Sequence, residues 1–345
     1  MKLSRLAAVL ALPTVAALVL AGCAASPAAS TGGSIKGQTI TVYNAQHEEL
    51  TQAWADAFEK ESGVKVVLRN GSDSEMANQI VQEGQASPAD VFLTENSPAM
   101  SLVEKAGLFA DVDAATLDAV PSEYRPSTGK WTGIAARSTV FVYNTKLLSE
   151  SQLPKSLDDL ATPAWKGRWA ASPSGADFQA IVSAYLDLKG KSATLAWLKA
   201  MKTNSVAYQG NSTVMKAVNA GEIPGGVIYH YYWFGDQADG AQNSANTKLH
   251  YFKNQDPGAF VSVSGGGVLK SSKHAEAAQA FLKFIVDKGG QDILQTGTSY
   301  EYPVASDVAA NSKLPSLASL EAPKIDPSKL NSTEVTDLMT EAGLI

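Results

Sequence analysis

Three short segments place reactive side chains directly after stretches that are rich in β-forming residues. His47 follows the first of these stretches, Glu95 follows another, and the adjacent Tyr231 and Tyr232 follow a short Val-Ile-Tyr-His run. Ligands of open α/β sheets lie beyond the carboxyl ends of the strands, so we expect these four residues to line one cleft. One imidazole, one carboxylate and two phenols would form a site of nitrogen and oxygen donors without sulfur.

The two phenols restrict which ion such a site could hold. A free phenol has a pKa of about 10, so it binds a metal near neutral pH only when a strongly charged cation displaces its proton. Oxygen donors also select against copper(I) and other soft ions. Ferric ion fits, because Glu95 and two phenolates would balance its charge of three. A six-coordinate ion would keep further positions open.

Each of these residues also has a purely structural interpretation. A histidine after a strand is often a solvated or capping residue, and Glu95 could favour the start of the following helix. Tyr231 and Tyr232 could belong to the core. Adjacent side chains point about 100° apart on a helix and to opposite faces of a strand. The two hydroxyls therefore converge only if the backbone turns from strand to helix beside them.

The surrounding sequence alternates between strand and helix patterns, which predicts an α/β fold with a mostly parallel sheet. Two long β-rich runs, near 139–143 and 260–268, predict two lobes joined by two crossing strands with the ligand cleft between them. The boundaries are 38–137 plus 262–311 for lobe 1 and 138–261 plus 312–345 for lobe 2. The expected strands are 38–43, 64–68, 89–93, 139–143, 167–171, 226–229 and 258–269, and the expected helices are 48–61, 74–83, 97–106, 174–188, 195–201, 213–219 and 274–286.

The N-terminus is typical of an exported protein. Lys2 and Arg5 precede an almost wholly apolar run at 6–20, which is too short to span a bilayer comfortably and suits a signal peptide over 1–22. The run ends in Leu-Ala-Gly before Cys23, which resembles a bacterial lipobox. We therefore expect a lipidated Cys23, a flexible tether over 23–37 and an extracytoplasmic, lipid-anchored body. The alternative is an ordinary cleavage site beside an incidental cysteine.

Composition excludes several classes of protein. The 345 residues are 45% hydrophobic and 18% charged, which is ordinary for a globular chain. The one cysteine excludes a disulfide framework and any multi-cysteine zinc or iron–sulfur site. The net charge of -6 argues against nucleic acid as a partner. Catalytic motifs are incomplete: after His47-Glu48, position 51 is Thr where a metalloprotease helix needs a second His. We therefore expect no enzyme.

Beyond these features, the chain resembles the bacterial periplasmic ferric-ion-binding proteins over about residues 39–305. The resemblance implies a bilobal type 2 periplasmic-binding-protein fold that serves an ATP-driven iron importer (an ABC transporter permease), as a monomer. It further implies that His47, Glu95, Tyr231 and Tyr232 ligate Fe3+. The stretches that carry it are ITVYNAQH at 40–47, SPADVF at 87–92 with Glu95, ATPAWK at 161–166, NS at 211–212, YYW at 231–233, DPGA at 256–259 and VLKSS at 268–272.

The resemblance also implies a small synergistic anion, phosphate or carbonate, in the remaining positions around the iron. The matching segment is Ser174, Gly175 and Ala176 at the start of a predicted helix, with Asn211 as a further donor. Free N–H groups and the helix dipole attract anions there, although Ser174 could be only the helix N-cap. Tyr229 stands where some family members have Asn, which leaves the identity of the anion open.

Two alternatives to iron capture remain at this point. The same scaffold could bind another small solute, such as an organic anion or a polyamine, or the protein could be a secreted metal-dependent hydrolase. His230, beside the tyrosine pair, is expected at the surface.

Overall fold

The computed structural model describes residues 34–345, so the predicted signal peptide, Cys23 and most of the predicted tether lie outside the described residues. The fold begins slightly before the predicted boundary at residue 38. Ile35 packs against the apolar core, and the Gly37 N–H donates a hydrogen bond to the Gly63 carbonyl at 2.9 Å. Within the part that is described, no helix is long and apolar enough to cross a membrane.

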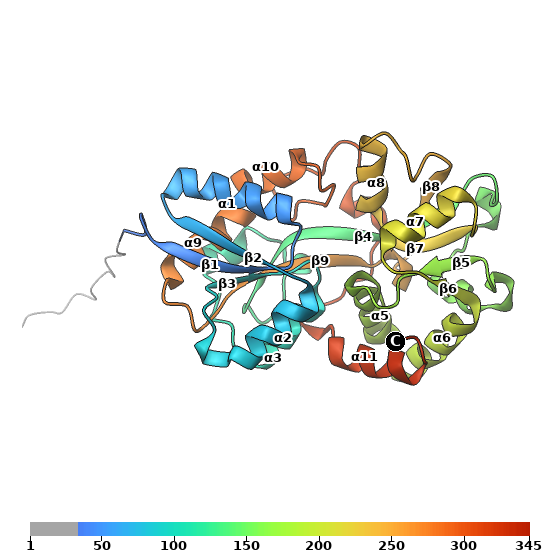
Figure 1. Ribbon diagram of the computed structural model, residues 1–345, viewed down its shortest axis with the longest axis horizontal. Helices are drawn as coiled ribbons and strands as arrows, with labels where there is room; N and C mark the ends of the chain where they lie inside the picture. Colours follow the sequence, from blue (N-terminus) through green and yellow to red (C-terminus); the bar gives the residue numbers. More distant parts are fainter. Residues whose placement is uncertain (1–33) are drawn as a thin grey trace, which may run out of the picture. The chain divides into compact units, whose positions relative to one another are not determined.

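A nine-stranded mixed sheet runs through the molecule in the order β2-β1-β3-β9-β4-β7-β5-β6, and β8 pairs with β4 beside this path (Figure 1). The sheet is mixed rather than mostly parallel because β9 and β4 run antiparallel to their neighbours. The strands are β1 (Thr39–Asn44), β2 (Lys65–Asn70), β3 (Val91–Leu93), β4 (Thr132–Asn144), β5 (Trp169–Ala171), β6 (Ser205–Ala207), β7 (Gly225–Tyr229), β8 (Thr247–His250) and β9 (Val261–Val268).

Helices cover both faces of the sheet. Around β1–β3, helices α1, α9 and α10 lie on one face and α2 and α3 on the other; around β5–β7, helices α5, α6 and α11 lie on one face and α7 on the other (Figure 1). The helices are α1 (Glu48–Ser62), α2 (Asp73–Glu83), α3 (Ser97–Lys105), α4 (Ala114–Asp118), α5 (Ala176–Lys189), α6 (Lys191–Asn204), α7 (Asn211–Ala220), α8 (His230–Ala238), α9 (Ala275–Val286), α10 (Lys288–Thr296) and α11 (Ser332–Glu341).

Apolar spacing explains why these segments are helical and which face each one buries. In α1, Leu50, Trp54 and Phe58 recur at intervals of four residues, and all three are buried. Phe58 packs against Phe281 of α9 with ring centroids 5.2 Å apart. The helix ends at Gly63, whose positive φ of 72° is the left-handed conformation that closes many helices.

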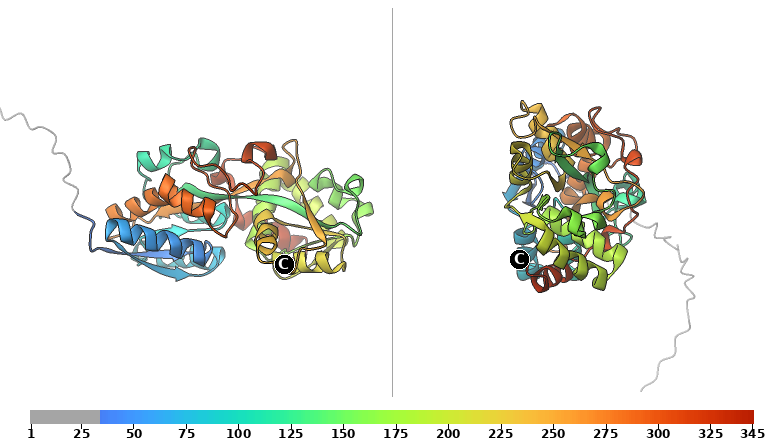
Figure 2. Two further views of the ribbon diagram at one scale, coloured as in Figure 1. Left: turned by 90° about the horizontal axis from the view of Figure 1, so that it is seen from above. Right: turned by 90° about the vertical axis from the view of Figure 1, so that its right-hand side faces the viewer.

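Strands β4 and β9 connect the two ends of the sheet, and β4 crosses the molecule as one continuous strand (Figure 2). Its first part pairs with β9, and its second part pairs with β7 and β8. The change of partner falls between Ser138, opposite Val261, and Thr139, opposite Tyr229. This position lies within one residue of the predicted lobe boundaries at 137/138 and 261/262, and the division into two moving lobes stays a prediction.

The glycine triplet of β9 leaves room for its neighbours rather than for a turn. A Cβ atom on Gly265 would lie 2.3 Å from Met100 Cγ. A Cβ on Gly266 would lie 2.7 Å from Leu282 Cδ1, and one on Gly267 would lie 2.6 Å from a Phe109 ring carbon. These three side chains approach β9 from α3, from α9 and from the segment after α3. The triplet therefore lets packed side chains come close to the backbone.

Candidate metal centre

The structure brings the four predicted ligands together from three strand ends. His47 stands directly before α1, Glu95 follows β3, and the two tyrosines lie in the first turn of α8 directly after β7. His47 Nε2 is 3.6 Å from Glu95 Oε1, and the His47 ring meets the Tyr231 ring edge-on with centroids 5.0 Å apart. The backbone turns from strand to helix at Tyr229, which is the N-cap of α8. This turn is what the convergence of the tyrosines requires.

Both phenols point to one carboxylate that the sequence analysis did not select. Asp177, the second residue of α5, accepts a hydrogen bond from Tyr231 Oη at 3.3 Å and from Tyr232 Oη at 3.1 Å. The same Oδ2 atom accepts from Asn211 Nδ2 at 2.7 Å. The tyrosine rings stack with centroids 4.2 Å apart. The two hydroxyls are thus already directed at a common point beside a fixed negative charge.

A buried cation completes the electrostatics of the site. Arg137 of β4 is fully buried and forms an ion pair with the equally buried Glu301. Its Nη1 atom lies 3.3 Å from Glu95 Oε2 and 3.9 Å from Asp177 Oδ1. Its guanidinium also lies over the Tyr231 ring, 5.1 Å from the centroid. Three carboxylates therefore surround one arginine, and the cluster carries net negative charge before any metal binds.

Gln46 ties this charged cluster to the predicted histidine ligand. Its side-chain carbonyl accepts from the His47 N–H at 2.8 Å and from Arg137 Nη2 at 3.1 Å, and its amide donates to Glu301 Oε1 at 3.3 Å. The backbone that presents the imidazole is thereby fixed to the Arg137–Glu301 pair.

Burial shifts the protonation equilibria of the proposed ligands. It raises the pKa of Glu95 to about 7, with Arg137 opposing the shift and Asp177 adding to it. Burial, and then the Asp177 charge, raise the pKa values of Tyr231 and Tyr232 well above the usual phenol value. Burial lowers the pKa of His47, which keeps its imidazole neutral and able to donate a lone pair. A cation that binds here must therefore displace phenol protons.

Asn96 connects the elements on the two sides of the site. Its amide nitrogen donates to Asp73 Oδ2 at 3.3 Å and to Asp177 Oδ1 at 3.0 Å. Its oxygen accepts from Ser262 Oγ at 2.9 Å and from Tyr229 Oη at 3.4 Å. Both donor hydrogens and both acceptor positions are used. The buried amide thus joins α2, α5, β7 and β9 at the floor of the site.

The predicted anion segment lies beside this floor. Gly175 is the N-cap of α5 and Ala176 its first residue, so the segment does stand at a helix start. The alternative role of Ser174 as N-cap is wrong, because its hydroxyl instead donates to Gln209 Oε1 at 3.2 Å. Asn211, the predicted side-chain donor, is hydrogen-bonded to Asp177. A carboxylate of this chain therefore adjoins the place where the sequence predicts an exogenous anion.

The expectation that His230 lies at the surface is wrong. The ring is fully buried, its Nδ1 accepts from the Ser138 N–H at 3.1 Å, and it stacks on Tyr302 with centroids 4.7 Å apart. Burial lowers the pKa of His230 to about 3, so the ring is neutral. Its function is to pack the start of α8 against β4, which supports the tyrosine pair.

The sequence carried a signal for two of the three charged residues that the prediction omitted. Arg137 is the one charged residue of the fully buried β4, and such a buried charge requires partners. Asp177 directly follows the predicted anion segment. Glu301 lies in an irregular segment after α10 without any pattern. Among residues 34–345 there is no group of three or more His, Cys, Asp or Glu side chains placed to hold a metal, so a metal site here depends on the phenols.

Comparisons with known proteins point in the same direction as the geometry. The sequence profile of the family described as bacterial extracellular solute-binding protein matches residues 86–330. The chain is 68% identical to the Fe(3+)-binding periplasmic protein of Serratia marcescens, over 89% of this chain and 91% of that one. It is 39% identical to the major ferric iron-binding protein of Neisseria meningitidis serogroup B, over 88% and 93%.

A solved structure shares the fold. The crystal structure of iron-bound HitA from Pseudomonas aeruginosa superposes with a TM-score of 0.83 at 41% identity, covering 89% of this chain and all of that one. The predicted α/β fold of the type 2 periplasmic-binding-protein class is therefore confirmed. The resemblance found in the sequence is also confirmed.

Proposed function

The chain belongs to the bacterial extracellular solute-binding proteins, and from this membership we propose that it captures Fe3+ outside the cytoplasm and delivers it to an ATP-driven importer. Its relative from Serratia marcescens is an Fe(3+)-binding periplasmic protein, and its relative from Neisseria meningitidis is a ferric iron-binding protein. Such proteins are transport components rather than enzymes, which agrees with the incomplete catalytic motifs of this sequence.

The proposed ligands are His47, Glu95, Tyr231 and Tyr232. The observation that carries this proposal is the convergence of the two phenols on one point beside an imidazole and a carboxylate. Two phenolates and one carboxylate neutralise a trivalent ion, whereas a divalent ion would leave excess negative charge. Hard oxygen donors and a neutral imidazole are chemically suited to Fe3+.

The same geometry argues against a polyamine as the solute. A polyamine carries several ammonium groups along an extended chain, and each of them needs acceptors and space. Here Asp177 and Glu301 are already committed to Arg137, Asn211 and the phenols. The site is compact, and its two phenols converge on one point rather than along an extended groove.

A second part of the proposal concerns which group supplies the anion beside the iron. The resemblance predicts phosphate or carbonate at Ser174, Gly175, Ala176 and Asn211. We propose that the Asp177 carboxylate provides negative charge at this place, because it already engages Asn211 and both phenols. An exogenous anion would meet this fixed charge at close range, and in a buried site the repulsion is large.

Ferric titration followed by visible absorption tests the metal. Phenolate bound to Fe3+ absorbs visible light, so a band should grow until the protein is saturated. Ga3+, which has the same charge and no such band, should compete and abolish the colour. A titration that produces no band in the unmodified protein would contradict phenolate ligation.

The dependence of iron affinity on added phosphate or carbonate tests the proposed role of Asp177. With Asp177 present, iron affinity should be the same in buffers with and without phosphate or carbonate. Asp177→Asn keeps the shape and removes the charge, so iron binding by this variant should become dependent on added anion. If the unmodified protein itself requires phosphate or carbonate, then Ser174 to Ala176 hold an exogenous anion and Asp177 does not replace it.

Anchoring is proposed from the sequence alone. A lipidated Cys23 would hold the body at the outer face of the cytoplasmic membrane, within reach of the importer. Cys23→Ala should release the protein into the soluble fraction. A variant that stays with the membrane would contradict the lipid anchor.

A further inference from the structure

Glu301 stands behind the proposed metal centre without contacting a proposed ligand. Its carboxylate is fully buried, and its side-chain partners within residues 34–345 are Arg137, Gln46 and Ser264. An ionised carboxylate is costly to bury unless it is paired. Burial alone would raise the pKa of Glu301, but the Arg137 charge outweighs burial and holds this pKa below its usual value. Glu301 therefore carries a buried charge that acts on the site through its partners.

The backbone fixes Glu301 beside β4. Tyr302 forms two hydrogen bonds with Ala136, one in each direction at 2.8 and 2.9 Å, so the residue after Glu301 pairs with the residue before Arg137. The residue before Glu301, Tyr300, has a φ of 54°, which a bulky residue adopts only where the surrounding structure imposes it. The fold itself, and not the ion pair alone, thus places Glu301 next to Arg137.

Only one side of the Arg137 guanidinium is committed to hydrogen bonds. Nη2 donates to Glu301 and, at 3.1 Å, to Gln46 Oε1. Nη1 lies 3.3 Å from Glu95 Oε2 and 3.9 Å from Asp177 Oδ1, but neither contact has the geometry of a hydrogen bond. The guanidinium therefore keeps an unused donor beside a proposed iron ligand, and the bonds to Nη2 hold it back from that ligand.

The two oxygens of Glu95 face different neighbours. Oε2 is the oxygen beside Arg137, whereas Oε1 is 3.6 Å from His47 Nε2 and so lies on the side of the other proposed ligands. Oε1 is thus the oxygen that is placed to reach an ion held by the imidazole and the phenols. A guanidinium that moved forward to bond with both oxygens, in the bidentate geometry that arginine favours, would occupy Oε1 and withdraw Glu95 from iron.

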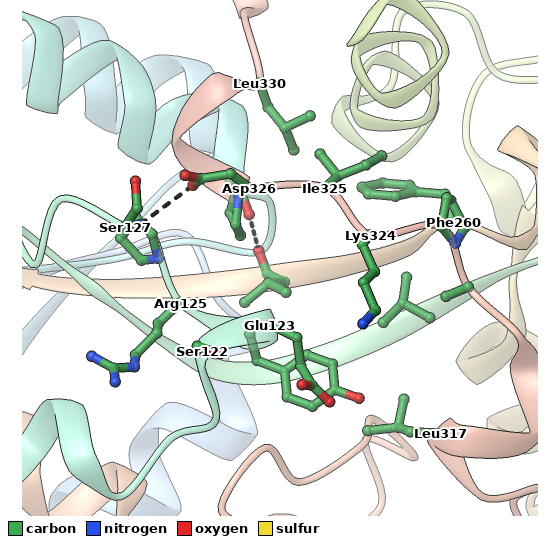
Figure 3. A pocket seen from close by; sticks show the side chains of 18 of the residues that line it. Ser122, Glu123, Arg125, Ser127, Phe260, Leu317, Lys324, Ile325, Asp326 and Leu330 are labelled. Carbon is green, nitrogen blue, oxygen red and sulfur yellow. Dashed lines mark hydrogen bonds between the residues drawn. The ribbon is translucent and has the colours of Figure 1, made fainter. Parts of the chain in front are cut away.

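No other charged group among the described residues is placed to replace Glu301. Strand β9 also borders a cavity of about 740 Å³, in which Figure 3 shows charged side chains of both signs. None of the residues that line this cavity forms an ion pair with Arg137. Without the Glu301 charge, the carboxylates left beside the guanidinium are therefore Glu95 and Asp177.

We propose that Glu301 is a positioning residue of the metal centre: it retains Arg137 and thereby leaves Glu95 Oε1 free to bind iron. Arg137 is the resident cation that competes with Fe3+ for the Glu95 carboxylate, and Glu301 decides this competition by offering the guanidinium a closer partner. The inference rests on the proposed iron capture, because the competition matters only if Glu95 is a ligand.

The test replaces Glu301 and then the arginine that it holds. Glu301→Gln keeps the shape and removes the charge, so ferric affinity, measured by the visible band in competition with nitrilotriacetate, should fall about tenfold. Glu301→Gln combined with Arg137→Met removes the competing cation as well and should return the affinity to within about threefold of the parent. Glu104→Gln, which changes a glutamate that bonds to the Trp131 indole outside the site, is the matched control and should bind iron like the parent.

A role of Glu301 in packing alone gives the opposite result in the double variant, because a second substitution in the same buried cluster then adds to the damage. Iron affinity of Glu301→Gln equal to that of the parent, or a double variant that binds iron no better than Glu301→Gln, overturns the proposal. Should Glu301→Gln not fold, Glu301→Asp keeps the charge but holds it one methylene further from Arg137. Its iron affinity should fall about threefold, and an unchanged affinity overturns the proposal.

A crystal structure of metal-free Glu301→Gln separates this proposal from the proposed function. Both Glu95 oxygens should lie within hydrogen-bond distance of the guanidinium in this variant, and an Oε1 that stays free of it overturns the proposal. A parent protein that gives no visible band with Fe3+ contradicts iron capture, while the metal-free structure still decides whether Glu301 keeps Arg137 away from Oε1.

Discussion

The two halves of the proposed metal centre are built differently. In the phenol half Tyr231 is buried and Tyr232 is partly buried, and Asp177 already holds both tyrosine hydroxyls in a common direction. The imidazole–carboxylate half is more open: the side chains of His47 and Glu95 are 31% and 26% exposed, and Glu95 is held mainly by Arg137. The comparison supports our prediction that the phenol half is organised in advance and that His47 and Glu95 complete the coordination on closure.

This difference assigns unequal shares of the binding energy to the two halves. Each phenol loses its proton when the metal binds. Each therefore contributes one full negative charge to the metal-bound state. His47 supplies no charge. We therefore expect losses of affinity to be largest for changes in the phenol half.

The largest expected effect comes from removing either phenol hydroxyl. Tyr231→Phe and Tyr232→Phe each delete one anionic ligand while keeping the packed ring. Iron affinity should fall by more than about a hundredfold, beyond the range seen when only a ligand's supporting partner is lost. The visible band should weaken or vanish. Tyr185→Phe, a tyrosine outside the site that bonds to Asp158, is the control and should leave both unchanged. Unaltered iron binding in both site variants would refute the assignment.

The pH dependence sharpens the comparison because the two halves titrate differently. At about pH 8, Glu95 is mainly ionised and the phenols are protonated, so iron releases both phenol protons. At about pH 6, Glu95 is protonated as well, since burial raises its pKa to about 7, and a further proton must leave. Affinity should therefore fall about a hundredfold per unit of decreasing pH near pH 8 and more steeply below pH 7.

Calorimetry in buffers of different ionisation enthalpy measures this proton release directly. His47 should release fewer protons than an unshifted imidazole, because burial lowers its pKa. Proton release that does not increase between pH 8 and pH 6 would contradict the role of Glu95. Absence of release at both pH values would contradict phenolate ligation.

His47→Ala tests the more open half. Water can replace a neutral imidazole, so the expected loss of iron affinity is about tenfold and the visible band should persist. The matched control is His274→Ala, another partly exposed histidine beside a carboxylate, Asp90, outside the site. A loss as large as that of the tyrosine variants would show that the two halves contribute equally.

The smallest expected effect concerns the amide that joins the two sides. Asn96→Ala removes the bond to Asp177 and should weaken iron binding about fivefold, which corresponds to a net hydrogen bond of about 1 kcal/mol. Small-angle scattering should show a larger average size for this variant without metal and the parental size with iron bound. Identical scattering of parent and variant without metal would argue that Asn96 does not hold the closed form.

Local patterns were sufficient to predict most of the elements. The helical spacing of Leu50, Trp54 and Phe58 predicted α1 to within a residue at each end. Helix α10 was not predicted, because Gly289 and Gly290 lower its intrinsic helix propensity. Tertiary contacts explain the glycine at position 290. The Trp54 indole donates to the Gly290 carbonyl at 2.8 Å, and a Cβ on Gly290 would lie 2.3 Å from the Phe284 carbonyl oxygen.

The site could be predicted where a residue type and a strand end coincide. This combination indicated His47, Glu95 and the tyrosine pair. Arg137 lies in the middle of β4, and Asp177 resembles an ordinary acid in the first turn of a helix. Their local signals mark them only as a buried charge and as an acid beside the anion segment, and their contacts with the site depend on elements that only the tertiary fold brings to one place.

The glycine triplet of β9 determines where the crossing strands are stiff. Because Met100, Leu282 and Phe109 fill the space beside these glycines, this end of β9 packs tightly against its neighbours, and we expect it to bend less than the rest of the strand. We therefore expect deformation to concentrate in the short stretch at 261–264, where serines and valines alternate between the two faces of the strand. A short flexible stretch of β9 would then lie directly next to a tightly packed one. Replacing any of the three glycines would disturb this packing. The flexibility of the strand would then change without any change in a proposed metal ligand.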